Sequence, residues 1–247
     1  MSETFIVSED TRNKIRKDQE SHFRELYRQH RGTPMAVSSE SPAHKDKRYS
    51  EIAGIFANRP SFTVHDVGMG LADFKAFLDR GFADRAITYS GSDILQEYVE
   101  EAGRRYPESQ FLVRDLSMAA GDDRYDYVTL SGVFHQRRNS SIPEWEAFAQ
   151  QLLENCFAMC ERGLAFNFIS PFVDFHQTEV YYCNLHKLIE FIPARLSRFF
   201  TIKHDYALYE FTVHVYREQE IARRDDRPEF KKYFKSPCFC EPGKPSG

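Results

Sequence analysis

The chain has 247 residues, of which 41% are hydrophobic, and this is enough for one sizeable core. Its net charge of −4 lacks the basic excess that is typical of proteins that bind nucleic acid or anionic membranes. No run approaches the ~20 apolar residues that span a bilayer, and the N-terminal segment has no apolar signal core. Together with few cysteines in an odd number, this predicts a cytoplasmic protein with no membrane contact.

The first 43 residues differ from the rest of the chain. Residues 10–31 are strongly charged with spaced apolar positions, which predicts a surface helix that ends at Gly32 and Pro34. Residues 33–43 (TPMAVSSESPA) have the composition of a linker or flexible lid. We therefore expect residues 1–43 to form a helical extension, as a lid or as the contact of a homodimer.

From residue 44 onward, helices and strands alternate. The predicted helices cover about 44–58, 71–80, 93–106, 143–161 and 184–193. The predicted strands cover about 62–67, 85–90, 109–114, 125–131, 164–170, 197–204 and 207–216. This alternation indicates a doubly wound α/β, Rossmann-like sheet of seven strands. The last two strands are joined too closely for a crossover helix, so we expect a mostly parallel sheet with a C-terminal antiparallel hairpin.

The cysteines give no sign of a metal site. Cys156 and Cys160 are expected to share one face of a helix as buried thiols. Cys238 and Cys240 lie in a stretch rich in Pro, Gly and Ser, where they could form a reactive thiol pair. We expect a domain over 44–217 and a flexible tail over 218–247.

A glycine-containing loop follows the first predicted strand. Gly68 and Gly70 allow a ligand to approach the backbone closely, because glycine has no Cβ. Ligands of open α/β sheets bind outside the carboxyl ends of the strands, where strand order reverses. The dinucleotide fingerprint G-x-G-x-x-G/A fits poorly, because Asp73 stands at its third position and would face a pyrophosphate.

The stretch VHDVGMGLA (64–72) resembles motif I, D/E-x-G-x-G-x-G, of the class I methyltransferases that use S-adenosylmethionine. Ala72 replaces the last glycine of that motif. The resemblance covers roughly 44–217 and also implies the terminal hairpin. It implies S-adenosylmethionine as the cofactor.

The resemblance assigns roles to residues at successive strand ends. It implies that Asp93 binds the ribose hydroxyls and that Asp115 binds the adenine amino group. By themselves, Asp93 could be only a helix N-cap and Asp115 only a turn residue. Arg48 or Tyr49 would reach the cofactor carboxylate. The residues expected at the cofactor are Tyr49, Asp66, Gly68, Gly70, Ala72, Asp93, Ile94, Asp115, Leu116 and Ser131.

Catalysis and acceptor binding are expected at the same edge. His135 follows the fourth strand, and it is the candidate general base, with a structural histidine as the alternative. Phe134 and the loop SPFVDFHQTEVYY, with Asp174, His176 and Tyr181, are candidates for the acceptor pocket. A plain surface loop is the alternative there.

These features predict methyl transfer from S-adenosylmethionine to an oxygen or nitrogen of a small molecule, such as a sugar or secondary metabolite. A DNA methyltransferase is disfavoured, because SGVF stands where N/D-P-P-Y/F is usual and the chain is acidic. The remaining alternatives are a protein methyltransferase, a non-catalytic module that binds S-adenosylmethionine, and a dehydrogenase.

Overall fold

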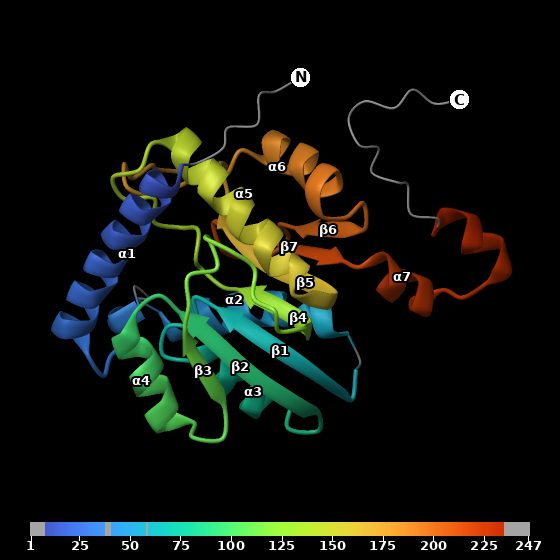
Figure 1. Cartoon of the computed structure of the whole chain (residues 1–247), viewed down its shortest axis with the longest axis horizontal. Coiled ribbons are helices and arrows are strands. Elements are labelled where there is room, and N and C mark those ends of the chain that lie inside the picture. The colour runs from blue at the N-terminus through green and yellow to red at the C-terminus, as the bar shows by residue number, and fades with distance from the viewer. Residues whose placement is uncertain (1–7, 38–40, 58, 235–247) are drawn as a thin grey trace.

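Seven strands form one twisted sheet in the order β3-β2-β1-β4-β5-β7-β6 (Figure 1). The computed structural model describes residues 8–37, 41–57 and 59–234. The strands are β1 (Ser61–Val67), β2 (Ala86–Asp93), β3 (Gln110–Val113), β4 (Tyr125–Leu130), β5 (Cys160–Ile169), β6 (Phe200–Lys203) and β7 (Glu210–Tyr216). The first five strands run parallel, and β7 lies antiparallel between β5 and β6. This confirms the predicted fold class.

Helices cover both faces of the sheet. They are α1 (Glu9–His30), α2 (Pro42–Ala53), α3 (Asp73–Gly81), α4 (Gln96–Arg105), α5 (Ile142–Ala158), α6 (Leu185–Phe191) and α7 (Glu218–Arg224). The apolar side chains of α2 and α3 form one buried cluster with β1 and β2. Those of α5 and α6 form another cluster with β4, β5 and β7. The sheet is therefore the middle layer of three, as in doubly wound folds.

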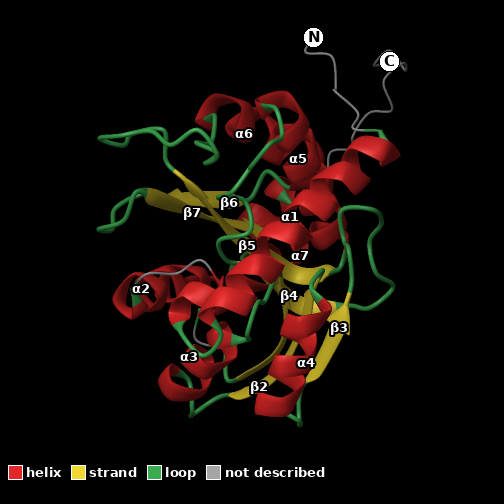
Figure 2. Cartoon of the chain, turned by 90° about the vertical axis from the view of Figure 1, so that its left-hand side faces the viewer, coloured by secondary structure: helices red, strands yellow, loops and turns green. Residues whose placement is uncertain are grey.

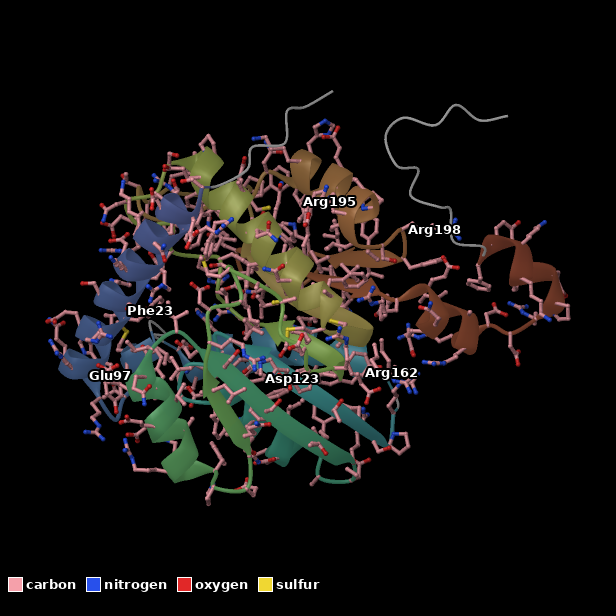
Figure 3. All side chains as sticks on the ribbon, viewed as in Figure 1. Phe23, Glu97, Asp123, Arg162, Arg195 and Arg198 are labelled. Carbon is pink, nitrogen blue, oxygen red and sulfur yellow. The ribbon has the colours of Figure 1, made fainter. Side chains whose placement is uncertain are left out.

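Helix α1 lies against α4, on the side that faces the reader in Figure 2. Its N-cap is Ser8, whose hydroxyl accepts a hydrogen bond from the backbone of Thr11. Phe23 of α1 and Glu97 of α4 lie on the facing helices (Figure 3), and Arg24 forms an ion pair with Glu97 at 2.8 Å. The expected helix over 10–31 is thus present, and it packs on the domain.

The segment after α1 also packs tightly as far as the structure describes it. A 3₁₀ turn covers Pro34–Val37, and the Ala36 side chain is fully buried. The hydroxyl of Tyr98 on α4 donates a hydrogen bond to the Ala36 carbonyl. Residues 38–40 of the expected linker lie outside the described residues.

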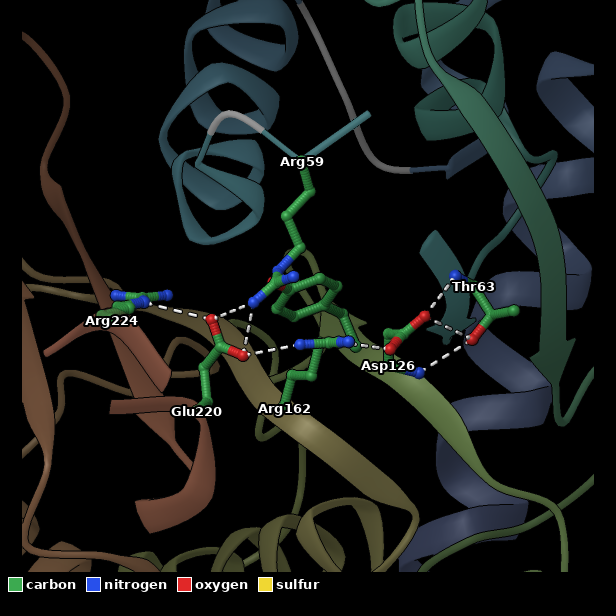
Figure 4. A network of polar contacts seen from close by, with 7 residues as sticks. Arg59, Thr63, Asp126, Arg162, Glu220 and Arg224 are labelled. Atoms are coloured by element: carbon green, nitrogen blue, oxygen red, sulfur yellow. Dashed lines mark hydrogen bonds and ion pairs between the residues drawn. The ribbon is translucent and has the colours of Figure 1, made fainter. Parts of the chain in front are cut away.

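A flexible tail was predicted from residue 218, but the chain continues as ordered structure there. Helix α7 covers Glu218–Arg224, and a 3₁₀ segment covers Pro228–Tyr233. The buried Glu220 side chain accepts hydrogen bonds from Arg59, Arg162 and Arg224 (Figure 4). Arg59 and Arg162 lie far from α7 in the sequence, so the tail composition gave no sign of the anchor. Cys238 and Cys240 lie outside the described residues.

Several predicted element boundaries were wrong by a few residues, and two of these differences move residues named above. Helix α4 begins at Gln96 rather than near residue 93, because Asp93 completes β2. Helix α5 ends at Ala158, so Cys160 begins β5 instead of sharing a helix with Cys156. Both thiols are buried and free, as expected. Within residues 8–37, 41–57 and 59–234, no helix combines the length and apolarity needed to cross a membrane.

Candidate active site

A cavity opens at the carboxyl ends of β1, β2, β3 and β4, between the glycine loop and α1. The sheet order reverses between β1 and β4, and this is the place where open α/β sheets bind ligands. Helices α1, α2 and α5 complete the wall. Gln19 and Phe23 come from α1, so the N-terminal extension forms part of the cavity.

The glycine loop has the backbone conformation that its sequence requires. Gly68 and Gly70 have φ values of +66° and +55°, and Ala72 is also left-handed with φ 58°. A Cβ on Gly68 would lie 2.6 Å from Cγ2 of Val133, which is too close. The loop is held over β2, because the Gly68 N–H donates to the Ser92 carbonyl at 2.8 Å. Glycine is therefore required at position 68 for both conformation and space.

Gly91, which was not among the predicted residues, supports the same loop. It lies within β2, and a Cβ at this position would lie 2.6 Å from the Met69 sulfur and 3.2 Å from the Asp66 carbonyl oxygen. A glycine in a strand interior can indicate a close backbone approach, and this was the available signal.

Gly68→Ala is expected to lower the free energy of unfolding by about 2 kcal/mol, because it adds left-handed strain and a clash with Val133. Urea unfolding followed by circular dichroism measures this change. The matched control is Gly103→Ala on α4, where a Cβ meets no atom within 4 Å. The control is expected to leave stability unchanged or raise it by up to about 1 kcal/mol. Equal stability of the two variants would contradict the strained loop.

Asp93 lies at the end of β2 and its side chain lines the cavity. Its two carboxylate oxygens accept backbone hydrogen bonds from Gly70 at 3.0 Å and from Leu95 at 2.9 Å. Burial raises the pKa of Asp93 to about 6, although these backbone bonds act to lower it. The carboxylate thus joins the glycine loop to α4 at the cavity wall.

Two buried polar atoms at the cavity have no hydrogen-bond partner among the described residues. Asp115 Oδ2 and Ser131 Oγ make no hydrogen bond to any residue that the structure describes. Arg16 Nε lies 3.6 Å from this Asp115 oxygen, while Ser117 satisfies the other oxygen. Buried polar atoms are normally paired, so these two atoms fit a ligand that supplies hydrogen-bonding groups.

Most of the residues predicted for the cofactor come together at this cavity. Those that line it are Tyr49, Gly68, Gly70, Asp93, Ile94, Asp115, Leu116 and Ser131. Arg48 lines it too, but its guanidinium already forms an ion pair with Glu210. The side chains of Asp66 and Ala72 do not reach the lining.

Asp66 lies beneath the loop rather than in the cavity. Its carboxylate accepts hydrogen bonds from the hydroxyls of Tyr89 at 2.7 Å and Thr129 at 3.1 Å. Burial raises its pKa to about 7, against the effect of these two donors. Asp66 was expected at the cofactor, but this position makes it a support of the loop.

The residues predicted for the acceptor pocket do not line this cavity. Phe134 is fully buried in the core and stacks on Phe168, and Tyr181 is buried with its hydroxyl 3.2 Å from Glu146. Asp174 and His176 are exposed, where they contact Tyr209 and Tyr182. The expected acceptor-pocket role of these four side chains therefore has no support in the geometry.

His135 does line the cavity, as predicted. Its Nε2 lies 3.1 Å from Nδ2 of Asn167, a fully buried residue of β5. Asn167 also contacts Glu210 and the backbone of Gly132. Sequence reasoning missed Asn167 and Glu210. A polar residue in the apolar run GLAFNFI was a signal for Asn167, whereas Glu210 had none.

One sequence relative is similar over most of its own length. The chain is 32% identical over 157 residues to the "Putative methyltransferase Rv1506c" of Mycobacterium tuberculosis (strain ATCC 25618 / H37Rv). That match covers 62% of this chain and 92% of the relative. The sequence matches no protein-family profile.

Solved structures share the fold. A magnesium protoporphyrin IX methyltransferase from Synechocystis PCC 6803 with bound S-adenosylmethionine has a TM-score of 0.57 at 16% identity, covering 86% of this chain and 100% of that one. The N-methyltransferase NodS from Bradyrhizobium japonicum WM9, in complex with S-adenosylhomocysteine, has a TM-score of 0.56 at 9% identity, covering 80% and 97%. At these identities the likeness establishes a common architecture.

Proposed function

Because the chain belongs to the class I S-adenosylmethionine-dependent methyltransferases, we propose that its cavity binds S-adenosylmethionine and passes the methyl group to an oxygen or nitrogen of a small molecule. The observation that carries the proposal is the set of polar groups at the strand ends. Asp93 presents a carboxylate there, and Asp115 Oδ2 and Ser131 Oγ lack hydrogen-bond partners within the described residues. This arrangement fits a ligand with a ribose and an adenine amino group.

The side chains have distinct parts in this proposal. Asp93 accepts hydrogen bonds from the ribose hydroxyls, Asp115 Oδ2 accepts one from the adenine amino group, and Ile94 and Leu116 pack on the base. S-adenosylmethionine itself supplies the electrophilic methyl group. The protein then contributes binding, orientation and exclusion of water.

Residues 1–43 fit a lid better than a dimer contact in this proposal. Gln19 and Phe23 of α1 line the cavity of their own chain. The Gln19 amide donates a hydrogen bond to the Gln136 carbonyl at 2.8 Å, which joins α1 to the loop after β4. Helix α1 would therefore help to exclude water from a bound cofactor.

The acceptor is proposed to be small, with a sugar or another secondary metabolite as the substrate class and oxygen slightly preferred over nitrogen. Two observations support a small acceptor. The chain carries a net charge of −4, which does not favour nucleic acid, and one protein of the same fold is named for a small-molecule substrate, magnesium protoporphyrin IX.

Isothermal titration calorimetry tests the cofactor directly. The purified chain is titrated with S-adenosylmethionine, S-adenosylhomocysteine and NAD in parallel. We expect micromolar binding of the first two and none of NAD. Binding of NAD alone would overturn the proposal, and binding of the first two would justify a screen of small-molecule acceptors with oxygen and nitrogen nucleophiles.

Cofactor affinity is expected to fall in acid, because the ribose hydroxyls need the ionised form of Asp93. The pKa of this group is raised by burial to about 6, so its carboxylate is lost as the pH falls through 6. Affinity at pH 5 should be about tenfold weaker than at pH 7, as calculated for one proton that must be released. Calorimetry at pH 5, 6 and 7 measures the change, and equal affinity throughout would contradict it.

A further inference from the structure

The orientation of the Asn167 amide is fixed by its neighbours on both sides. Its Oδ1 accepts a hydrogen bond from the backbone N–H of Gly132 at 2.8 Å. Its Nδ2 donates to a carboxylate oxygen of Glu210 at 2.6 Å. A backbone N–H can only donate and a carboxylate can only accept, so a flipped amide would lose both bonds.

Glu210 is held in its ionised form by Arg48. The guanidinium donates through Nε at 2.8 Å and through Nη2 at 2.5 Å, one bond to each carboxylate oxygen. Burial acts to raise the pKa of Glu210, but the charge that the His135 ring carries when protonated and the donors on Arg48 and Asn167 hold that pKa below its ordinary value. The carboxylate therefore remains an acceptor for the amide at neutral pH.

The remaining Nδ2 hydrogen of Asn167 faces Nε2 of His135 at 3.1 Å. An amide N–H can only donate, so Nε2 must carry the lone pair and Nδ1 must carry the ring proton. Burial lowers the pKa of His135 to about 4, while the charge of Glu210 acts to raise it and that of Arg48 to lower it. The ring is thus neutral, and the lone pair on Nε2 already accepts a hydrogen bond from Asn167. It is therefore not free to accept a proton from a substrate.

The other ring nitrogen of His135 makes no hydrogen bond within the described residues that would compete with one to a ligand. Nδ1 of His135 has no hydrogen-bond partner within residues 8–37, 41–57 and 59–234, and the ring lines the cavity beside Gly132. Ser131, one of the residues expected at the cofactor, precedes Gly132.

We propose that Asn167 fixes His135 as the neutral Nδ1–H tautomer, so that His135 donates a hydrogen bond to an oxygen of the methyl acceptor instead of removing a proton from it. Asn167 is then a positioning residue, with Arg48 and Glu210 holding its amide. The inference rests on the proposed function, and it replaces the general-base role that the sequence suggested for His135. The acceptor chemistry that it requires is an oxygen group that is already ionised when it binds, such as a carboxylate, so that one oxygen accepts the hydrogen bond and no proton has to be removed when the methyl group is transferred.

The test is a measurement of the ring tautomer by nuclear magnetic resonance. Protein labelled with ¹⁵N-histidine is recorded in long-range ¹H–¹⁵N correlations, and the signals of His135 are assigned by their loss in His135→Gln. We expect a protonated Nδ1 and an unprotonated Nε2, unchanged from pH 5 to pH 8. An Nε2–H tautomer, or titration of this ring near neutral pH, would overturn the proposal.

A substitution tests the part of Asn167. Asn167→Asp removes the amide donor, so Nε2 of His135 should gain a proton and the pKa of the ring should rise by at least one unit. The matched control is Asn184→Asp, the same change at an exposed helix cap where Asp serves equally well. An unchanged tautomer in Asn167→Asp would overturn the role of Asn167, and the wild-type spectrum decides the tautomer even if that variant does not fold.

The cofactor-free measurement separates this inference from the proposed function. An Nδ1–H ring in a protein that binds no S-adenosylmethionine by calorimetry would disprove the function but leave the tautomer established. Binding of S-adenosylmethionine by a protein whose His135 ring is in the Nε2–H form would support the proposed function and disprove the tautomer.

Discussion

Asp93→Ala is expected to weaken the binding of S-adenosylmethionine at least tenfold. The substitution removes the carboxylate at the end of β2 that lines the cavity and that also accepts the backbone N–H of Gly70. A hydrogen bond to a charged group contributes roughly 1.5–3 kcal/mol, and 1.4 kcal/mol corresponds to a tenfold change in affinity. Calorimetry of the purified variant measures the loss.

Asp84→Ala is the matched control for this experiment. Asp84 is exposed in the turn between α3 and β2, so the same change of charge is made outside the cavity. Its affinity should equal that of the wild type. If Asp93→Ala is folded and also binds like the wild type, the ribose role of Asp93 is wrong.

Glu220→Ala is expected to destabilise the protein by about 3 kcal/mol, the low end of the cost of breaking a buried ion pair. The carboxylate is almost fully buried and accepts hydrogen bonds from Arg59, Arg162 and Arg224 (Figure 4). Burial acts to raise its pKa, but these donors outweigh that effect and lower it. For a chain of this size the loss corresponds to a fall in Tm of roughly 6–12 °C.

The control for the thermal melt is Glu161→Ala, an exposed carboxylate that neighbours Arg162 on β5. Its Tm should stay close to that of the wild type, since surface substitutions usually change stability by less than about 0.5 kcal/mol. The folded-state pKa of Glu220 is depressed, so its contribution is present at neutral pH and is lost as the pH falls through that pKa. The difference in Tm between Glu220→Ala and wild type should therefore shrink in acid. A Glu220→Ala melt like that of the control would show that α7 is not anchored through this residue.

The placement of Asp93 and Asp115 at the cavity was predictable because it depends on strand ends. Asp93 ends β2 and Asp115 follows β3, and the carboxyl ends of parallel strands meet at one edge. The alternation of predicted helices and strands identified these two strands in the sequence. The positions of such residues follow from local sequence and topology alone.

The surroundings of His135 and the direction of the Phe134 side chain were not predictable in the same way. Phe134 lies in a polar loop by sequence, yet its ring turns into the core against Phe168. The direction of a side chain after a strand depends on packing partners that come from other elements. Asn167 and Glu210 reach His135 from β5 and β7, and only the order of strands in the sheet brings these residues together.

Helix α1 contributes Gln19 and Phe23 to the cavity wall, although α2 and its flanking segments separate α1 from β1 in the sequence. Any ligand that touches these side chains favours the docked form of the helix. By thermodynamic reciprocity, the free energy by which docking tightens the ligand equals the free energy by which the ligand tightens docking. Binding of a ligand in the cavity should therefore slow amide hydrogen exchange along the whole of α1, including residues that do not touch the ligand.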